Sequence, residues 1–239
     1  MLCLDAGNSR LKFGLFAEGR WMQQGVVDYA VLGDLDRHLP ARPERIVACN
    51  VAGPHVAQGI GTLARQLAVP LEWLTSSATA CGVSNGYDRP QQLGADRWAA
   101  LIGARARHAG AAVVVMAGTA TTIDALDATG RFRGGLILPG LELMRHSLAN
   151  RTADLPHAQG TYRDLATNTD DAIVSGAIHA TLGAIARVRA ALGDDVACLL
   201  SGGAADELAA LIPAPVLPIS NLVLEGLACY GGSTRSRCS

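Results

Sequence analysis

The chain has 239 residues, 49% of them hydrophobic, which is enough for one large core or two modest ones. Its 20 basic and 21 acidic residues give a net charge of -1, which argues against the basic surface that nucleic acid binding needs. An acid at position 5 and a glycine at position 7 interrupt any N-terminal apolar run long enough for a signal peptide or a membrane span. We therefore expect a cytoplasmic protein with neither a nucleic acid nor a membrane as its partner.

The cysteines show no metal-binding or disulfide pattern. Several lie in apolar, strand-like runs, where cysteine behaves as a small hydrophobic residue. We predict neither a zinc site nor a disulfide framework. The six are Cys3, Cys49, Cys81, Cys198, Cys229 and Cys238.

The first half of the chain alternates apolar runs with glycine-containing turns and then with helical patterns. Such runs predict three antiparallel strands followed by strands and helices in alternation. The segment 76–94 is predicted to be a loop. The expected elements are strands 1–5, 11–16 and 20–27, a short helix 29–38, strand 45–50, helix 56–67, strand 71–75 and helix 95–108.

A second cycle of the same kind begins near residue 112. Its order repeats that of the first half, and a shift of 111 residues aligns Gly7 with Gly118 and Asp5 with Met116. We infer two α/β lobes of duplicated mixed-sheet topology, 1–110 and 111–239, with a cleft between them. The expected elements are strands 112–116, 121–126 and 131–138, helix 169–192, strand 196–200, helix 204–211, strand 216–219 and helix 222–229.

The first glycine turn, Asp5-Ala6-Gly7-Asn8-Ser9-Arg10-Leu11-Lys12, has the composition of a phosphate-binding loop. Small residues leave backbone N–H groups exposed to phosphate oxygens, and a carboxylate beside a polyphosphate requires a cation between them. We therefore expect Asp5 to hold Mg²⁺ and Lys12, the only lysine of the chain, to face the phosphates. An ordinary β-hairpin turn is the alternative interpretation.

Two further glycine turns follow predicted strands. The turn 117–124, AGTATTID, supplies hydroxyls and amides in the second lobe, and two such turns would hold a nucleotide triphosphate from both sides. The turn Ser201-Gly202-Gly203 would let a planar ring approach the backbone, so we assign Gly202 to adenosine; a bare tight turn is the alternative.

Several motifs occur in the order seen in type III pantothenate kinases, and the chain resembles that family over most of its length. They are DxGNSxxK at the start, GADR at 94–97, AGTATTID at 117–124, GGLILPG at 134–140, SLANRTADLP at 147–156 and NTDDAIVSG at 168–176. The resemblance implies two ribonuclease-H-like lobes of the actin-like ATPase fold. It also implies a homodimer that phosphorylates pantothenate with ATP in the first step of coenzyme A synthesis.

The resemblance also implies roles for individual residues. Asp5 to Lys12 would bind the ATP phosphates, Thr119 would contact ATP from the second lobe, and Asp96 would act as general base. The implied pantothenate site comprises Tyr87, Gly94, Ala95, Asp96, Arg97 and Thr169. Chemistry supports this set independently, because the Arg97 fork could neutralise the carboxylate of pantothenate.

One position departs from the family pattern. Met116 stands where the family commonly has an aspartate associated with a monovalent cation, and a thioether is a poor ligand for potassium. The cation would then be bound by other oxygens, not needed, or lost together with activity. Asp124 leaves one carboxylate in this segment for metal or phosphate positioning. This departure motivates a non-catalytic regulatory homologue as an alternative to the kinase. A phosphohydrolase on the same fold, in which water replaces the hydroxyl acceptor, is a second alternative.

Overall fold

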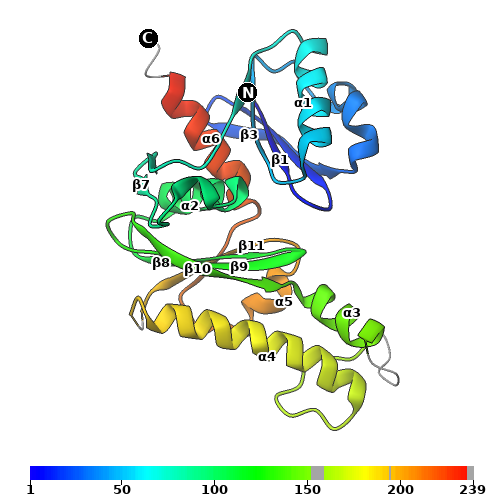
Figure 1. Cartoon of the computed structure of the whole chain (residues 1–239), viewed down its shortest axis with the longest axis vertical. Coiled ribbons are helices and arrows are strands. Elements are labelled where there is room, and N and C mark those ends of the chain that lie inside the picture. Colours follow the sequence, from blue (N-terminus) through cyan, green and yellow to red (C-terminus); the bar gives the residue numbers. More distant parts are fainter. Residues whose placement is uncertain (152–158, 194, 236–239) are drawn as a thin grey trace. The chain divides into compact units, whose positions relative to one another are not determined.

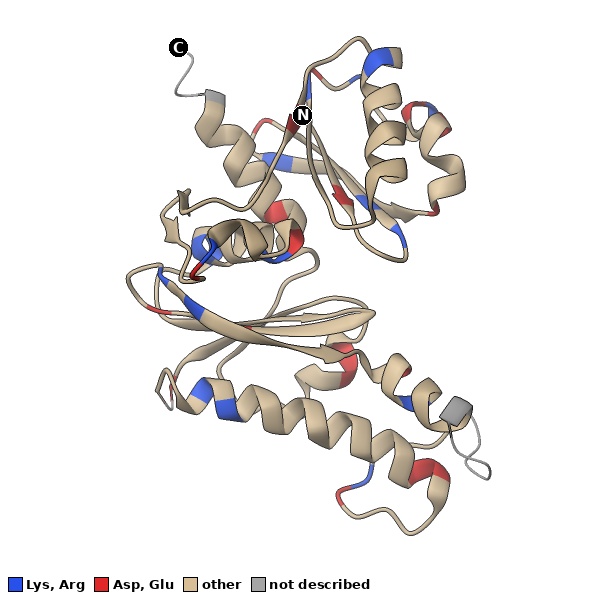
Figure 2. Ribbon diagram, in the orientation of Figure 1, with Lys and Arg blue, Asp and Glu red and all other residues tan. Residues whose placement is uncertain are grey.

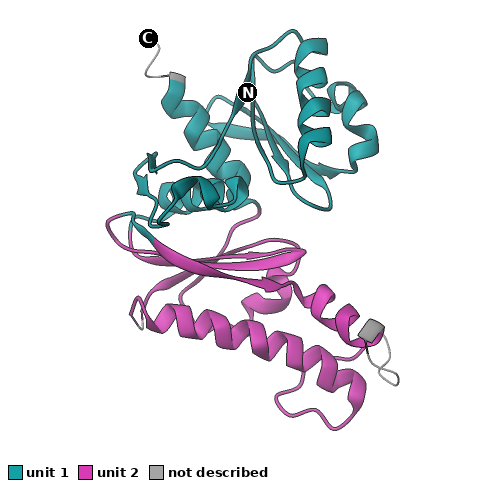
Figure 3. Ribbon diagram, in the orientation of Figure 1, with its two compact units in different colours: residues 1–109, 130–132, 221–239 teal, residues 110–129, 133–220 magenta. Residues whose placement is uncertain are grey.

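The computed structural model describes residues 1–151, 159–193 and 195–235, so the SLANRTADLP motif lies outside the described residues from position 152 onward. The chain forms two compact units, and the first combines residues 1–109, 130–132 and those from 221 onward (Figure 3). The second combines residues 110–129 and 133–220.

Unit 1 is built on a five-stranded mixed sheet in the order β3-β2-β1-β4-β5 (Figure 1). The first three strands are antiparallel neighbours, and β4 and β5 join them in parallel through crossover helices. The predicted strands are thus confirmed to within a few residues. Their bounds are β1 Leu2–Ala6, β2 Leu11–Ala17, β3 Arg20–Val27, β4 Ile46–Asn50 and β5 Leu71–Trp73.

Helices cover both faces of this sheet. On one face, Leu2, Leu4 and Ala6 of β1 pack with residues of η1 (Tyr29–His38) and α1 (Pro54–Gln66) in one buried cluster. Because side chains alternate along a strand, Cys3 and Asp5 face the other side, which α2 (Ala95–Arg107) and α6 (Leu222–Arg235) cover. The predicted helix 29–38 exists, but it is a 3₁₀ helix.

The C-terminal helix α6 belongs to unit 1, whereas the sequence placed it in the second lobe. Its backbone meets that of α2 at two glycines. A Cβ on Gly226 would come within 1.8 Å of the Ala99 carbonyl oxygen, and one on Gly103 within 2.2 Å of the Leu222 oxygen. This pairing depends on residues distant in sequence, so periodicity within either helix cannot reveal it.

The segment 76–94, predicted to be a loop, contains a short hairpin of β6 (Thr79–Ala80) and β7 (Val83–Ser84) and a 3₁₀ turn η2 (Pro90–Gln92). Ser84 also bridges to Arg131, so the hairpin is held by residues 130–132. Two-residue strands are too short to produce a periodic signal, which is why the sequence did not predict them.

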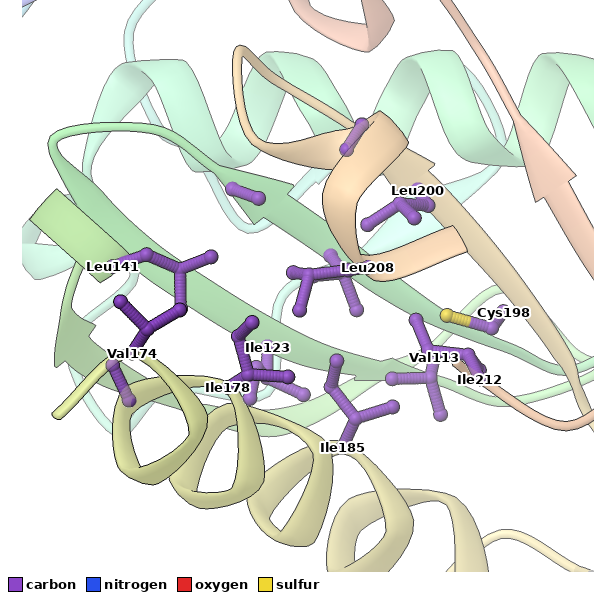
Figure 4. Packing of buried hydrophobic residues seen from close by; sticks show 14 of the residues in the cluster. Val113, Ile123, Leu141, Val174, Ile178, Ile185, Cys198, Leu200, Leu208 and Ile212 are labelled. Carbon is purple, nitrogen blue, oxygen red and sulfur yellow. The ribbon is translucent and has the colours of Figure 1, made fainter. Parts of the chain in front are cut away.

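Unit 2 repeats the sheet of unit 1 in the order β10-β9-β8-β11-β12, as the duplication predicts. Its buried cluster joins the sheet to α4 and α5, and Figure 4 shows Val113, Ile123, Ile178 and Leu208 meeting there. The bounds are β8 Ala112–Ala117, β9 Ala120–Leu126, β10 Phe132–Pro139, α3 Leu141–Arg151, α4 Thr169–Ala190, β11 Ala197–Ser201, α5 Ala205–Ala209 and β12 Val216–Pro218. Helix α3 is an element that the sequence did not predict.

The long helix α4 carries charges that match its dipole. Asn168 caps its start by accepting a hydrogen bond from the Asp171 amide at 2.9 Å, and Asp170 and Asp171 occupy the first turn. Arg187 and Arg189 lie in the last turn, so the charges sit at the two ends of the helix (Figure 2). The fold class predicted from the sequence, two α/β lobes of duplicated mixed-sheet topology, is confirmed.

Candidate active site

In unit 1 the centre of the candidate site is the Asp5 carboxylate at the end of β1. It is 4% exposed and lies on the sheet face covered by α2 and α6. The cross-strand partner Lys12 places its Nζ 3.6 Å from Asp5 Oδ2, and the Cys49 thiol of the parallel strand β4 donates to Oδ1 at 3.7 Å. The pairing of β1 with β2 and β4 therefore places both Lys12 and Cys49 beside Asp5.

Burial raises the pKa of Asp5 above its ordinary value, Lys12 opposes this shift, and the negative charge of Asp96 adds to it. The two carboxylates are thus close enough to repel each other. A single, partly exposed ammonium does not fully compensate a buried carboxylate with an acidic neighbour. The arrangement therefore favours an additional cation at Asp5.

The turn after Asp5 exposes Asn8, Ser9 and Arg10, while Gly7 is half-buried. The side chains of Ala6 and Leu11 are fully buried in the core of unit 1. These two residues can thus offer a ligand only their backbone groups, whereas the exposed residues between them can also use side chains.

Tyr29, the first residue of η1, holds both ends of this turn. Its hydroxyl donates to the Gly7 carbonyl oxygen and lies 3.3 Å from the Arg10 carbonyl oxygen. Burial, with a smaller contribution from the negative charge of Asp5, raises the pKa of Tyr29 to about 12. The hydroxyl therefore remains a donor throughout the physiological pH range.

Asp96 lies in the first turn of α2, directly after Gly94 and Ala95. Its Oδ1 accepts a hydrogen bond from the Arg97 amide at 2.8 Å. A Cβ on Gly94 would come within 2.6 Å of the same oxygen, so any larger residue would displace the carboxylate. Glycine at position 94 is therefore required for this placement of the Asp96 carboxylate.

Arg97 is 5% exposed and packs beside a pair of aromatic rings. Its Nη1 donates to the Tyr87 hydroxyl at 2.9 Å, and its guanidinium carbon lies 5.7 Å from the Tyr87 ring centroid and 5.8 Å from that of Phe132. The two rings are 5.4 Å apart. Aromatic faces attract a cation, so these contacts fix the guanidinium in one orientation.

In unit 2 the second glycine turn and the Gly202 turn lie side by side. The Ala204 amide donates to the Ala117 oxygen at 3.1 Å, and a Cβ on Gly202, whose φ is +110, would come within 2.4 Å of that oxygen. Thr119 is exposed, and its backbone oxygen accepts a hydrogen bond from Gly140 at 2.9 Å. Sequence reasoning named both turns, and the structure brings them together.

Beside this turn, the Thr121 and Thr122 hydroxyls are buried and lack a hydrogen-bond partner among the described residues. Thr122 is the cross-strand partner of Met116 on β8. Asp124, expected near the turn, instead lies in the middle of β9 opposite Val114 and is fully buried. It is therefore a strand residue rather than part of the loop.

Thr169 is the remaining candidate residue of unit 2. As the first residue of α4 it lines a groove of about 770 Å³ together with Met144, Ser147 and Leu148 of the α3 segment. None of the other candidate residues lines this groove.

A family model for type III pantothenate kinases matches residues 1–191. The chain is 48% identical over 232 residues to the type III pantothenate kinase of Aromatoleum aromaticum, with 95% of this chain and 96% of that protein covered. It is 46% identical over 230 residues to the enzyme of the same name from Dechloromonas aromatica, with coverages of 95% and 97%. The chain belongs to the type III pantothenate kinase family.

Solved structures confirm the fold of this pantothenate kinase family member. A putative Baf family transcriptional activator from Campylobacter jejuni aligns with a TM-score of 0.65, 20% identity, and coverage of 99% of this chain and 100% of that one. A putative 2-dehydro-3-deoxygalactonokinase from Sinorhizobium meliloti gives 0.64 at 16% identity, with 98% of both chains covered. MreB 5 of Spiroplasma citri bound to AMPPNP gives 0.51 at 9% identity, with coverages of 99% and 97%. At these identities the likeness shows the actin-like ATPase fold alone.

Four residues that neighbour the candidate site in this structure were not predicted from the sequence. Cys49 could have been found from strand register, because it pairs with Asp5 in parallel. Thr122 stands in the quoted AGTATTID motif but was not singled out. Tyr29 and Phe132 gave no signal, because each is an ordinary aromatic residue at the start of an element.

Proposed function

We propose that this chain transfers the γ-phosphoryl group of ATP to the terminal hydroxyl of pantothenate and releases 4'-phosphopantothenate, the first intermediate of coenzyme A synthesis. Family membership over most of the chain supports the activity. The observation that carries the mechanism is the pair of nearby carboxylates, Asp5 buried and Asp96 at the start of α2, in unit 1.

Asp5 is the residue that would hold Mg²⁺, and its surroundings fit that role. A buried carboxylate with a raised pKa beside another acid gains from a divalent cation. Among the described residues no group of three or more His, Cys, Asp or Glu side chains could hold a metal alone. Mg²⁺ commonly uses one or two carboxylates together with phosphate oxygens and water, so ATP would complete its coordination and the ion would neutralise the transferring group.

The residues Asp5 to Lys12 would bind the phosphates of ATP. Exposed backbone and side chains at Asn8, Ser9 and Arg10 supply donors, and Lys12 supplies a positive charge on the next strand. In unit 2, Thr119 and Gly202 would contact the nucleotide. Their two turns pack side by side at the Ala117 carbonyl group, which supports a shared contact with the nucleotide.

Asp96 would accept the proton of the pantothenate hydroxyl as that oxygen attacks the γ-phosphorus. Its fixed hydrogen bond to the Arg97 amide leaves the second carboxylate oxygen to receive this proton. Arg97, held by Tyr87 and Phe132, would bind the pantothenate carboxylate, and Gly94 and Ala95 would line the same site.

Thr169 would also contact pantothenate. The groove that it lines has a volume within the range of small-molecule sites, about 300–1,000 Å³. This position is supported by the family motif NTDDAIVSG, which begins at the helix cap Asn168.

A monovalent cation, K⁺ or NH₄⁺, would depend on oxygens other than a residue 116 carboxylate. The Thr122 hydroxyl is one candidate, because it is buried without a partner among the described residues and pairs across the sheet with Met116. Hydroxyl oxygen suits such an ion better than thioether sulfur does.

We propose a homodimer as the working form in the cytoplasm. Unit 2 exposes large apolar side chains that isolated proteins usually cover, including Ile137 of β10 at 65% and Leu143 of α3 at 49%. None of the helices in the described part of the chain has the length and apolarity of a bilayer span.

The activity can be tested by measuring ADP formation with and without pantothenate. Turnover that requires pantothenate supports the kinase. Equal turnover without it would support a phosphohydrolase, and binding of ATP without turnover would support a regulatory homologue.

A further inference from the structure

Cys81 and Cys229 differ from the other described cysteines of the chain. Cys3, Cys49 and Cys198 are buried in the two cores, whereas Cys81 and Cys229 are both partly exposed. All five are free thiols. The proposed function assigns no role to Cys81 or Cys229, so this pair is a candidate for a second chemistry.

The two thiols lie near each other although they are 148 positions apart in the chain. Cys81 occupies the turn between β6 and β7, where its φ of +48 is left-handed, and its Sγ lies 3.3 Å from the Ser233 hydroxyl. Ser233 follows Cys229 by four residues on α6, and residues at this spacing share one helix face. Cys81 therefore faces the same side of α6 as Cys229, and it lies close enough to Cys229 to influence the pKa of that thiol.

From this geometry we propose that Cys81 and Cys229 are a dithiol site that reacts with low-molecular-weight disulfides and closes to an intramolecular disulfide. Because Cys81 contacts Ser233, one helical turn from Cys229, rotation of the two side chains can bring the sulfurs toward the S–S bond length of about 2.05 Å. A zinc site is not supported, since no third ligand completes a cluster among the described residues.

The reaction consists of two successive thiol–disulfide exchanges. The Cys81 thiolate attacks the reagent disulfide and releases one reagent thiolate, which leaves a mixed disulfide on Cys81. The Cys229 thiolate then attacks the Cys81 sulfur, forms the protein disulfide and releases the second reagent thiolate. The protein loses two electrons and two protons, and the reagent disulfide is reduced to two thiols.

Burial and the neighbouring Cys81 raise the pKa of Cys229 to about 11. The fraction of Cys229 thiolate therefore rises about tenfold per pH unit between pH 7 and pH 9, and the closing step should follow it. We assign the first attack to Cys81, because the raised pKa of Cys229 leaves little of that thiol ionised at pH 7.

Closing the bond would tether the β6–β7 hairpin to α6. The hairpin is already held by its own short strands, by contacts of Ser84 with residues 130 and 131, and by the contact of Cys81 with Ser233. Tyr87 follows Ser84 by three residues, so the tether acts on the segment that leads into Arg97. This consequence rests on the proposed function, whereas the disulfide itself does not.

The test uses full-length protein with Cys238→Ser, because Cys238 lies outside the described residues and could compete. After incubation with oxidised glutathione, intact-mass measurement should show the loss of two hydrogens, and digestion should yield one peptide pair linked through Cys81 and Cys229. Cys229→Ser should instead retain glutathione on Cys81, and Cys81→Ser should form no linked pair.

A stable mixed disulfide on Cys81 with Cys229 present, or no reaction of either thiol while the circular dichroism spectrum remains native, would overturn the proposal. A closing rate that does not rise between pH 7 and pH 9 would also contradict it. Failure of the kinase proposal would appear separately, as absent pantothenate-dependent turnover in the reduced protein.

Discussion

Replacing Tyr29 with Phe should weaken ATP binding without affecting pantothenate binding. The change removes the hydroxyl that donates to Gly7 and approaches Arg10, and it keeps the ring that packs in η1. The lost hydrogen bond is worth about 1 kcal/mol, and leaving the Gly7 carbonyl without a partner can raise the cost to about 2 kcal/mol. In the variant, ATP itself must order the turn, so this energy is subtracted from its binding.

The expected result is a KM for ATP raised about 5- to 30-fold, which is the factor corresponding to 1–2 kcal/mol. The assay varies ATP at saturating pantothenate and then pantothenate at saturating ATP. Tyr162→Phe is the matched control, because its hydroxyl bonds to Asp164 on an exposed segment of unit 2. An unchanged KM for ATP, or an equal rise in both KM values, would refute the role of Tyr29 in holding the turn.

Three further substitutions test other parts of the account. Asp5→Asn should abolish turnover and should raise the thermal midpoint more at pH 8 than at pH 4. Burial raises the folded pKa of Asp5 above its ordinary value of 3.8, so wild-type stability falls as the pH rises from that value through the folded pKa, and the variant lacks this loss. A thermal midpoint that falls equally at both pH values would contradict this. Met116→Asp should increase the response of kcat to K⁺ over Na⁺, and identical responses would remove residue 116 from cation binding. Gly226→Ala should cost about 1–3 kcal/mol or more in urea unfolding, because its Cβ would meet Ala99, whereas Gly232→Ala, with open space around it, should cost little.

The local features of the fold were predictable from the sequence because they depend on neighbouring residues. Alternating apolar runs and glycine turns gave the strands of both sheets to within a few residues, and the repeated order gave the duplication. Helix α3 was missed because its residues show almost no amphipathic period. The place of α6 was missed because it depends on the contact of Gly226 with Ala99, which lie far apart in the chain.

The candidate site was predictable where a residue lies within a motif, and unpredictable where a neighbour comes from another element. Asp5, Lys12 and Asp96 were named from motifs, and their proximity within unit 1 follows from strand register and the start of α2. Phe132 contacts Arg97 because residues 130–132 belong to unit 1, which no local pattern encodes. Tyr29 is a similar case, since it reaches the first turn from a 3₁₀ helix.

The central claim is that Asp96 receives the proton of the substrate hydroxyl while Asp5 and its turn hold the nucleotide. The most direct measurement is formation of phosphorylated pantothenate by mass spectrometry in wild type and Asp96→Asn, together with calorimetric binding of MgATP to each. We predict product formation at least about 100-fold slower in the variant with nearly unchanged MgATP affinity, the loss expected for a positioned base. Near-normal product formation by Asp96→Asn would contradict the account.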